Sequence, residues 1–221
     1  MTTKPASVIC IGGSAGSLTP LTTLVSAFPK NMSIPIVVCI HRGMPVGTIS
    51  TPRLVNVLRR STGLVVTEVE DLDSLTPGIH IAPPGYHTLV AGNALALSPE
   101  PPESYSLPSI DVLFESAAQS HGAGVVAVVL SCANTDGVDG VGYVAAAGGT
   151  IIVQDPETAE HDTLIRAILL EGELRPTSSS PDMTRHPDGQ VRTGPSKSAL
   201  TRSTPPIDLP SGFWLLGDDR D

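Results

Sequence analysis

Three polar residues stand where apolar, strand-like runs end: Ser14, His41 and Asp136. A serine hydroxyl is a weak nucleophile until an imidazole takes its proton, and a carboxylate must hold that imidazole in the right tautomer. If the three preceding strands are neighbours in a parallel sheet, the side chains converge at one edge, where open α/β sheets bind ligands. The spacing therefore favours a serine hydrolase.

The turn that carries Ser14 has a second interpretation. Residues 12–16 contain three glycines that allow a sharp turn from strand to helix, and a helix N-terminus offers free N–H groups to an anion. The turn could therefore cradle a phosphate. However, the glycines do not follow the dinucleotide-binding spacing, a histidine ends the second strand where a ribose-binding acid would be expected, and no lysine lies between Lys4 and Lys30 for a P-loop.

Each of the three residues also has an ordinary structural role open to it. Ser14 could cap the first helix, and His41 could be a surface histidine at a strand end. Asp136 could form a turn or cap the following helix, and Asp139 is a rival carboxylate three residues on. The loop 134–139 approaches a calcium-binding pattern but lacks the required ligands.

Apolar runs alternate with helical patterns along the chain, which indicates an α/β fold with a doubly wound, mostly parallel sheet and helices on both faces. Strands are expected at 7–12, 34–40, 64–69, 125–131 and 150–154, and helices at 17–28, 48–61, 109–121, 137–147 and 158–171. The pieces at 78–82, 86–91 and 94–98, with a turn signal at 91–93, predict a small antiparallel hairpin insertion or edge.

Composition and net charge limit the partners, the location and the cofactors that we expect for this protein. The 221 residues carry a net charge of -9, which argues against nucleic acid or anionic membrane as a partner. No apolar run reaches the roughly 18 residues of a membrane span, and the first residues lack a signal-peptide hydrophobic region. We expect a cytoplasmic protein with buried, inert thiols at Cys10 and Cys39. The histidines lack metal-ligand spacing, and we expect no metal and no cofactor.

The amino-acid composition of the chain changes after about residue 175. We expect residues 6–174 to form the catalytic domain, and the Pro-, Ser- and Thr-rich segment 175–221 to be a largely disordered tail. The apolar stretch 213–216 could dock on the domain or on a partner, or it could be a stray patch.

Five segments occur in the order seen in the chemotaxis protein-glutamate methylesterases, the CheB catalytic-domain family: IGGSAGSLTPL, VVCIHRG, LVVTEVEDLDSLTPGIHIAPPGYH, LPSIDVLFESAA and VVLSCANTDGVDG. The chain resembles that family over about residues 6–172. The resemblance implies a doubly wound sheet and a Ser-His-Asp triad that hydrolyses glutamate methyl esters on chemoreceptor helices, often with deamidation of receptor glutamines. Methylated chemoreceptors are then the expected partners.

By this resemblance Ser14 matches the nucleophile, His41 the general base and Asp136 the orienting carboxylate. Asp139 does not match a catalytic position.

The resemblance also assigns the oxyanion donors, which are backbone N–H groups that match Ala15 and Ala133. His87 and Asp111 fall on family motif positions near the site, and no chemical step is assigned to either residue.

Around the triad the chain departs from the family motifs. Ile40 stands where glutamine usually precedes the histidine, Leu107 replaces an arginine, and residues 162–165 replace Gly-Met-Pro before the last helix. The Asp loop usually reads Thr-Gly-Met-Gly-x-Asp-Gly, whereas residues 131–137 read Ser-Cys-Ala-Asn-Thr-Asp-Gly. Its Cys132 is either a packing substitution or a redox-sensitive thiol.

The sequence thus predicts a stand-alone methylesterase-like serine hydrolase, without the N-terminal receiver domain that family members commonly carry. Two alternatives stay open. One is a catalytically weakened homologue that acts as a binding or signalling module, and the other is a hydrolase of small-molecule esters.

Overall fold

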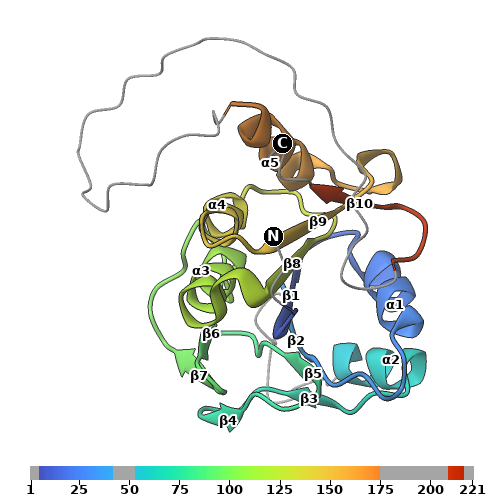
Figure 1. Cartoon of the computed structure of the whole chain (residues 1–221), viewed down its shortest axis with the longest axis vertical. Helices are drawn as coiled ribbons and strands as arrows, with labels where there is room; N and C mark the ends of the chain where they lie inside the picture. The colour runs from blue at the N-terminus through green and yellow to red at the C-terminus, as the bar shows by residue number, and fades with distance from the viewer. Residues whose placement is uncertain (1–4, 42–52, 175–208, 217–221) are drawn as a thin grey trace.

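A seven-stranded sheet forms the centre of the protein in the computed structural model, which describes residues 5–41, 53–174 and 209–216 (Figure 1). The strand order is β10-β9-β8-β1-β2-β5-β3, and every neighbouring pair is parallel except β9 with β10. These strands are β1 (Val8–Gly13), β2 (Pro35–Ile40), β3 (Val66–Glu68), β5 (Gly78–Ile81), β8 (Val125–Val129), β9 (Thr150–Gln154) and β10 (Phe213–Leu216).

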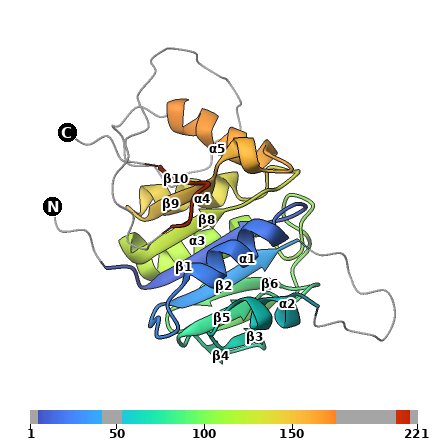
Figure 2. The same cartoon turned by 90° about the vertical axis from the view of Figure 1, so that its right-hand side faces the viewer.

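Helices cover both faces of this sheet, as predicted (Figures 1 and 2). One face packs against α1 (Leu18–Ala27) and α2 (Arg53–Ser61), and the other against α3 (Ile110–His121), α4 (Val138–Ala146) and α5 (Thr163–Leu174). Successive side chains of a strand point to opposite faces, so a strand buried on both faces needs an uninterrupted apolar run. In β1 the side chains of Ile9 and Ile11 face α1, while Val8 and Cys10 face α3.

A second sheet of three antiparallel strands packs beside α3, in the order β4-β7-β6. It comprises β4 (Asp73–Ser74), β6 (His87–Ala91) and β7 (Ala94–Ser98), and confirms the predicted hairpin. The grouping of residues 78–82 with that hairpin was wrong, because β5 lies in the main sheet between β2 and β3 and runs parallel to both. A short apolar run does not reveal which sheet it will join.

Two helix boundaries differ from the prediction. α5 begins at Thr163 rather than near residue 158, because Pro156–Thr158 forms a separate 3-10 turn after β9; another such turn, Gly122–Gly124, precedes β8. The predicted start of the second helix, at 48–52, lies outside the described residues, which resume at Arg53 with α2.

The apolar stretch near the C-terminus docks on the domain as β10, pairing Phe213 with Gln154 and Leu216 with Ile151 of β9. This observation decides between the alternatives for that stretch. The predicted disorder of residues 175–208 and 217–221 concerns parts of the chain outside the described ranges and stays a prediction.

The cysteines in the strands are buried as predicted, with Cys10 and Cys39 fully inaccessible. Burial raises the pKa of the Cys10 thiol, which keeps it protonated and unreactive. No helix within the described ranges combines the length and apolar character that crossing a bilayer requires.

The turn between β1 and α1 depends on Gly16. Its φ is +78°, and a Cβ atom there would lie 2.5 Å from Cβ of Glu160 and 2.6 Å from Oγ of Ser131. Ser131 is fully buried, so this turn packs directly against the loop after β8. Only glycine fits both the backbone conformation and the space.

Replacing Gly16 with alanine is expected to lower the free energy of unfolding by about 2–4 kcal/mol, as left-handed backbone strain adds to steric overlap. Gly92→Ala is the matched control, because its φ is +61° but no atom lies within 4 Å of the new Cβ. Its cost should be only about 1 kcal/mol. Urea unfolding followed by far-UV circular dichroism measures the free energy of unfolding of both variants. Equal losses of stability in the two variants would contradict the close packing around Gly16.

Candidate active site

The three predicted catalytic residues meet at the carboxyl edge of the main sheet. β1 pairs in parallel with β2 on one side and with β8 on the other. The chain therefore adds β2 on one side of β1 and later strands on the other side, and β1 marks the topological switch point of the sheet. Ser14 follows β1, His41 follows β2, and Asp136 lies in the loop after β8. The backbone N–H of His41 donates to the Gly13 carbonyl at 3.0 Å, and that of Ser14 donates to the Ser131 carbonyl at 2.9 Å.

Asp136 is fully buried, and both of its carboxylate oxygens accept hydrogen bonds. Oδ2 lies 2.6 Å from Nε2 of His41 and accepts the backbone N–H of Ile110 at 2.7 Å. Oδ1 accepts the hydroxyl of Ser109 at 2.7 Å. Burial alone would raise the pKa of Asp136, but the hydrogen bonds from His41, Ile110 and Ser109 outweigh burial and lower it. These hydrogen bonds favour the carboxylate form of Asp136, and the bond to Nε2 orients the imidazole.

The imidazole of His41 is held by the carboxylate of Asp136. Its burial lowers the pKa, but hydrogen bonds and charge interactions with Asp136 and with Cys132 raise it to about 9. Nε2 faces Asp136, which leaves Nδ1 for any further partner. No hydrogen bond joins the Ser14 hydroxyl to His41 among the described residues. Hydrogen bonds of this kind often shorten only when substrate binds.

Neither Ser14 nor Asp136 is the N-cap of the helix that follows it. The N-cap of α1 is Ser17 rather than Ser14, and the N-cap of α4 is Gly137, with φ of +116°. Asp139 lies exposed in the first turn of α4 and, within the described part of the chain, makes none of the contacts that hold His41.

Of the two predicted oxyanion donors, Ala15 lies in the turn after Ser14 and Ala133 lies in the Asp loop. Ala15 and Ala133 are both exposed, and neither backbone N–H donates a hydrogen bond within the described ranges. The hydroxyl of Ser131 donates to the Ala15 carbonyl at 2.7 Å and ties the two segments together. The absence of partners among the described residues is compatible with the predicted oxyanion role of these two N–H groups.

His87 is connected to Asp136 through Ser109. It is 1% exposed, and its Nε2 pairs with the Pro101 carbonyl at 2.9 Å. Its Nδ1 accepts the backbone N–H of Ser109 at 3.2 Å, and Ser109 in turn holds Asp136. His87 therefore fixes a partner of the carboxylate rather than contacting His41.

Asp111 occupies a similar supporting position at the start of α3. Its Oδ1 accepts the backbone N–H of Gly140 at 2.7 Å and joins α3 to α4, while its own N–H points to Asp136 at 3.3 Å. Burial, together with the nearby charge of Asp136, raises the pKa of Asp111 to about 7.

Two residues with a part in this site were missed at the level of sequence. Ser109 caps α3 through the N–H of Val112, and a serine before an apolar helical pattern does signal such a cap. Its second role, toward Asp136, has no sequence signal. Asn134 accepts both the Cys132 thiol at 3.0 Å and the Asp136 N–H at 3.3 Å, and so braces the Asp loop.

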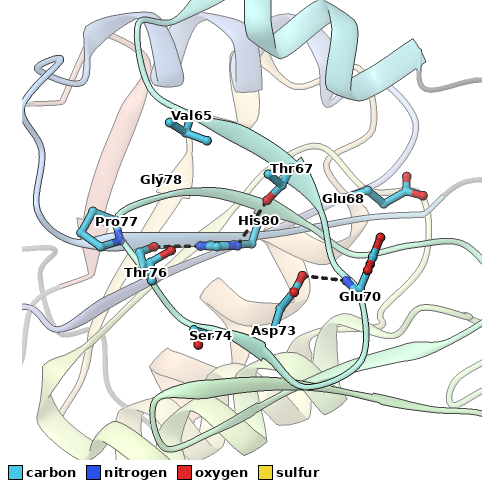
Figure 3. A pocket seen from close by; sticks show the side chains of 10 residues that line it. All are labelled: Val65, Thr67, Glu68, Glu70, Asp73, Ser74, Thr76, Pro77, Gly78 and His80. Carbon is cyan, nitrogen blue, oxygen red and sulfur yellow. Dashed lines mark hydrogen bonds between the residues drawn. The ribbon is translucent and has the colours of Figure 1, made fainter.

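A hollow of about 470 Å³ lies at the β3–β5 edge and includes none of the residues above (Figure 3). Its buried His80 pairs with the Thr76 carbonyl at 2.8 Å and lies 3.5 Å from the Thr67 hydroxyl. In the described part of the chain, no three His, Cys, Asp or Glu side chains gather in a way that could hold a metal ion.

Comparison with known proteins decides the family. The model of the CheB methylesterase family matches residues 9–184. The chain belongs to this family. CheB-type relatives include a protein of Leptospira interrogans, which is 34% identical over 154 residues that make up 69% of this chain and 78% of that protein. The crystal structure of the Thermotoga maritima CheB methylesterase catalytic domain superposes with a TM-score of 0.69 at 29% identity, covering 76% of this chain and 90% of that domain.

Longer relatives carry the name protein-glutamate methylesterase/protein-glutamine glutaminase. One from Maricaulis maris is 34% identical over 69% of this chain, and one from Rhodospirillum rubrum, numbered 1, is 37% identical over 67%. The matched segments make up 38% and 39% of those proteins, so this chain spans about two fifths of their length. The resemblance inferred from the sequence, and the carboxylic ester hydrolase class it implies, are confirmed at the level of the family.

The charge state of His41 can be measured directly. In the full-length protein, NMR titration of its imidazole should give a pKa of about 9, because Asp136 and Cys132 stabilise the protonated ring. Asp136→Asn should lower that pKa by at least one unit, since it removes the charged partner. Ser14→Ala is the control and should leave the titration unchanged. An ordinary histidine pKa in the unmodified protein would contradict the observed pairing.

Proposed function

We propose that this protein is a serine esterase that hydrolyses glutamate methyl esters on chemoreceptors. The observation that carries this proposal is the pairing of His41 with the buried Asp136, 2.6 Å apart, at the same sheet edge as Ser14. A histidine paired with a buried carboxylate, beside a serine on a strand-to-helix turn, is the arrangement that acyl transfer requires. Membership of the CheB methylesterase family supports the ester as substrate.

In the proposed reaction, Nδ1 of neutral His41 takes the proton of Ser14 as its oxygen attacks the ester carbonyl. The tetrahedral oxyanion is held by the N–H groups of Ala15 and Ala133, and one such donor contributes about 10²–10³ in rate. Collapse breaks the bond to the methoxy group, which leaves as methanol with the proton from His41. Water, activated by His41, then releases the glutamate and restores Ser14. Glutamine deamidation follows the same steps and releases ammonia.

The substrate and location in this proposal come from the family. The relatives from Maricaulis maris and Rhodospirillum rubrum are named for activity on protein glutamate and glutamine, which supports a protein substrate such as the cytoplasmic helices of methylated chemoreceptors. Three free, buried cysteines and a net charge of -9 support a cytoplasmic location and a partner other than nucleic acid.

One observation favours a second candidate, a catalytically weakened homologue that binds a signalling partner. No hydrogen bond reaches His41 from Ser14 among the described residues, and the Asp loop that should complete the site lacks the family's two glycines. Such a protein would keep the fold and the buried carboxylate without turnover.

Labelling by a fluorophosphonate probe separates the two candidates. The unmodified protein should react at Ser14, and Ser14→Ala should abolish the reaction. Ser26→Ala is the matched control, because Ser26 lies exposed on α1, away from the sheet edge, and its loss should leave labelling unchanged. A folded protein that is not labelled would favour the weakened homologue. Methanol release from methylated chemoreceptors, compared with turnover of small esters, then identifies the substrate class.

The pH dependence of hydrolysis should follow the charge on His41. The base must be neutral to accept a proton, and its pKa is raised to about 9, so kcat/KM should rise about ten-fold per pH unit from 6 to 8 and level off above 9. Steady-state rates of ester hydrolysis across pH 6–10 measure this profile. A midpoint near 6.5 would show that Asp136 and Cys132 do not stabilise the imidazolium in the working enzyme.

A further inference from the structure

A tight surface turn before α3 holds two residues in an unfavourable backbone conformation. Glu103 and Ser106 pair across it, with the N–H of Ser106 donating to the Glu103 carbonyl at 2.7 Å and the N–H of Glu103 donating to the Ser106 carbonyl at 3.2 Å. The two residues between them have positive φ, +48° at Ser104 and +63° at Tyr105. Two-residue turns of this kind favour asparagine and glycine, and a bulky side chain in the left-handed region is strained.

Hydrogen bonds join this segment to the catalytic carboxylate at both of its ends. At one end the Ser106 hydroxyl accepts the amide N–H of Asn134 at 3.1 Å, and Oδ1 of Asn134 accepts the N–H of Asp136 at 3.3 Å. At the other end the Pro101 carbonyl pairs with Nε2 of His87 at 2.9 Å, and His87 holds the cap of α3 that donates to the carboxylate. The turn therefore lies beside the catalytic edge of the sheet and is fixed relative to the site.

The fold does not use the side chain of Tyr105. This side chain is fully exposed, and its hydroxyl makes no hydrogen bond within the part of the chain that the structure describes. The neighbouring Ser106 is only 4% exposed, so the turn packs against the domain on one side and presents the tyrosine to solvent. Strained backbone of this kind is concentrated at sites of function. Tyrosine combines a large apolar ring with a hydroxyl and is enriched among the residues that dominate protein–protein contacts.

We propose that Tyr105 is a docking residue for the protein substrate and contacts the receptor helix beside the esterified glutamate. This inference rests on the proposed function, which brings a helical substrate to the edge where Ser14 and His41 lie. A helix with its side chains is about 10 Å across, so a bound helix extends past the reacting ester onto the adjoining turn. The ring of Tyr105 can there pack against apolar side chains of the helix. A small ester has no such extension and does not need this contact.

The test compares a protein substrate with a small one. Tyr105→Gly should lower kcat/KM for a methylated chemoreceptor fragment about ten-fold, mainly by raising KM, because it removes a residue that dominates a contact. Hydrolysis of p-nitrophenyl acetate is the reference and should change by less than about two-fold, since binding remote from the reacting group is lost. Tyr105→Phe keeps the ring and should retain most of the receptor activity.

Ser104→Gly is the matched control, because it changes the other strained position of the same turn and keeps the tyrosine. Both glycine variants relieve left-handed strain. Both should therefore have a thermal unfolding midpoint at least as high as that of the unmodified protein, which shows that the turn remains folded. Only Tyr105→Gly should lose receptor turnover.

Receptor turnover that survives Tyr105→Gly would overturn the inference. An equal loss with both substrates would also overturn it, because the substitution would then act on the catalytic geometry. A protein that hydrolyses neither substrate would instead overturn the proposed function. Titration calorimetry with the same receptor fragment then decides the inference: Tyr105→Gly should weaken binding about ten-fold, whereas unchanged binding, or no binding by the unmodified protein, would contradict it.

Discussion

The burial of Asp136 is the constraint around which the site is arranged. A carboxylate removed from water costs several kcal/mol unless its oxygens are fully satisfied. Here the hydroxyl of Ser109 and the N–H groups of Ile110 and Asp111 satisfy it, together with His41. Three of these four donors come from the first turn of α3 and its cap, where the helix dipole also favours a negative charge. The same carboxylate therefore fixes both the position of α3 on the sheet and the orientation of the imidazole.

The loop that supplies Asp136 is braced from several directions. Ser131 ties it to the turn after β1, and Asn134 ties it to the segment before α3. Its backbone also pairs with residues next to α5 through Cys132. Replacing glycines by larger residues in such a loop adds contacts that a glycine cannot make. In this chain the added contacts join Cys132, Asn134 and Ser106, and they brace the loop that presents Asp136 to His41.

The sequence was most informative where structure follows from local patterns. Continuous apolar runs predicted β1, β2 and β8, since strands buried on both faces leave no room for polar residues. The ends of those strands then located Ser14, His41 and Asp136. The sequence was less informative where a partner is distant in the chain: β5 joined the main sheet rather than the hairpin, and the docking of β10 on β9 stayed one of several alternatives. Periodicity identifies a strand but carries no information on its neighbour.

β10 lies beyond the residues that match the CheB family model, yet it covers the β9 edge of the sheet, which would otherwise present unpaired backbone groups. It also contains Trp214, the only tryptophan of the chain. Intrinsic tryptophan fluorescence therefore reports on the docking of this last strand rather than on the catalytic edge. Detachment of β10 would change the fluorescence spectrum of Trp214 while the helices remain folded. The spectrum would therefore show whether the β9 edge of the sheet is covered.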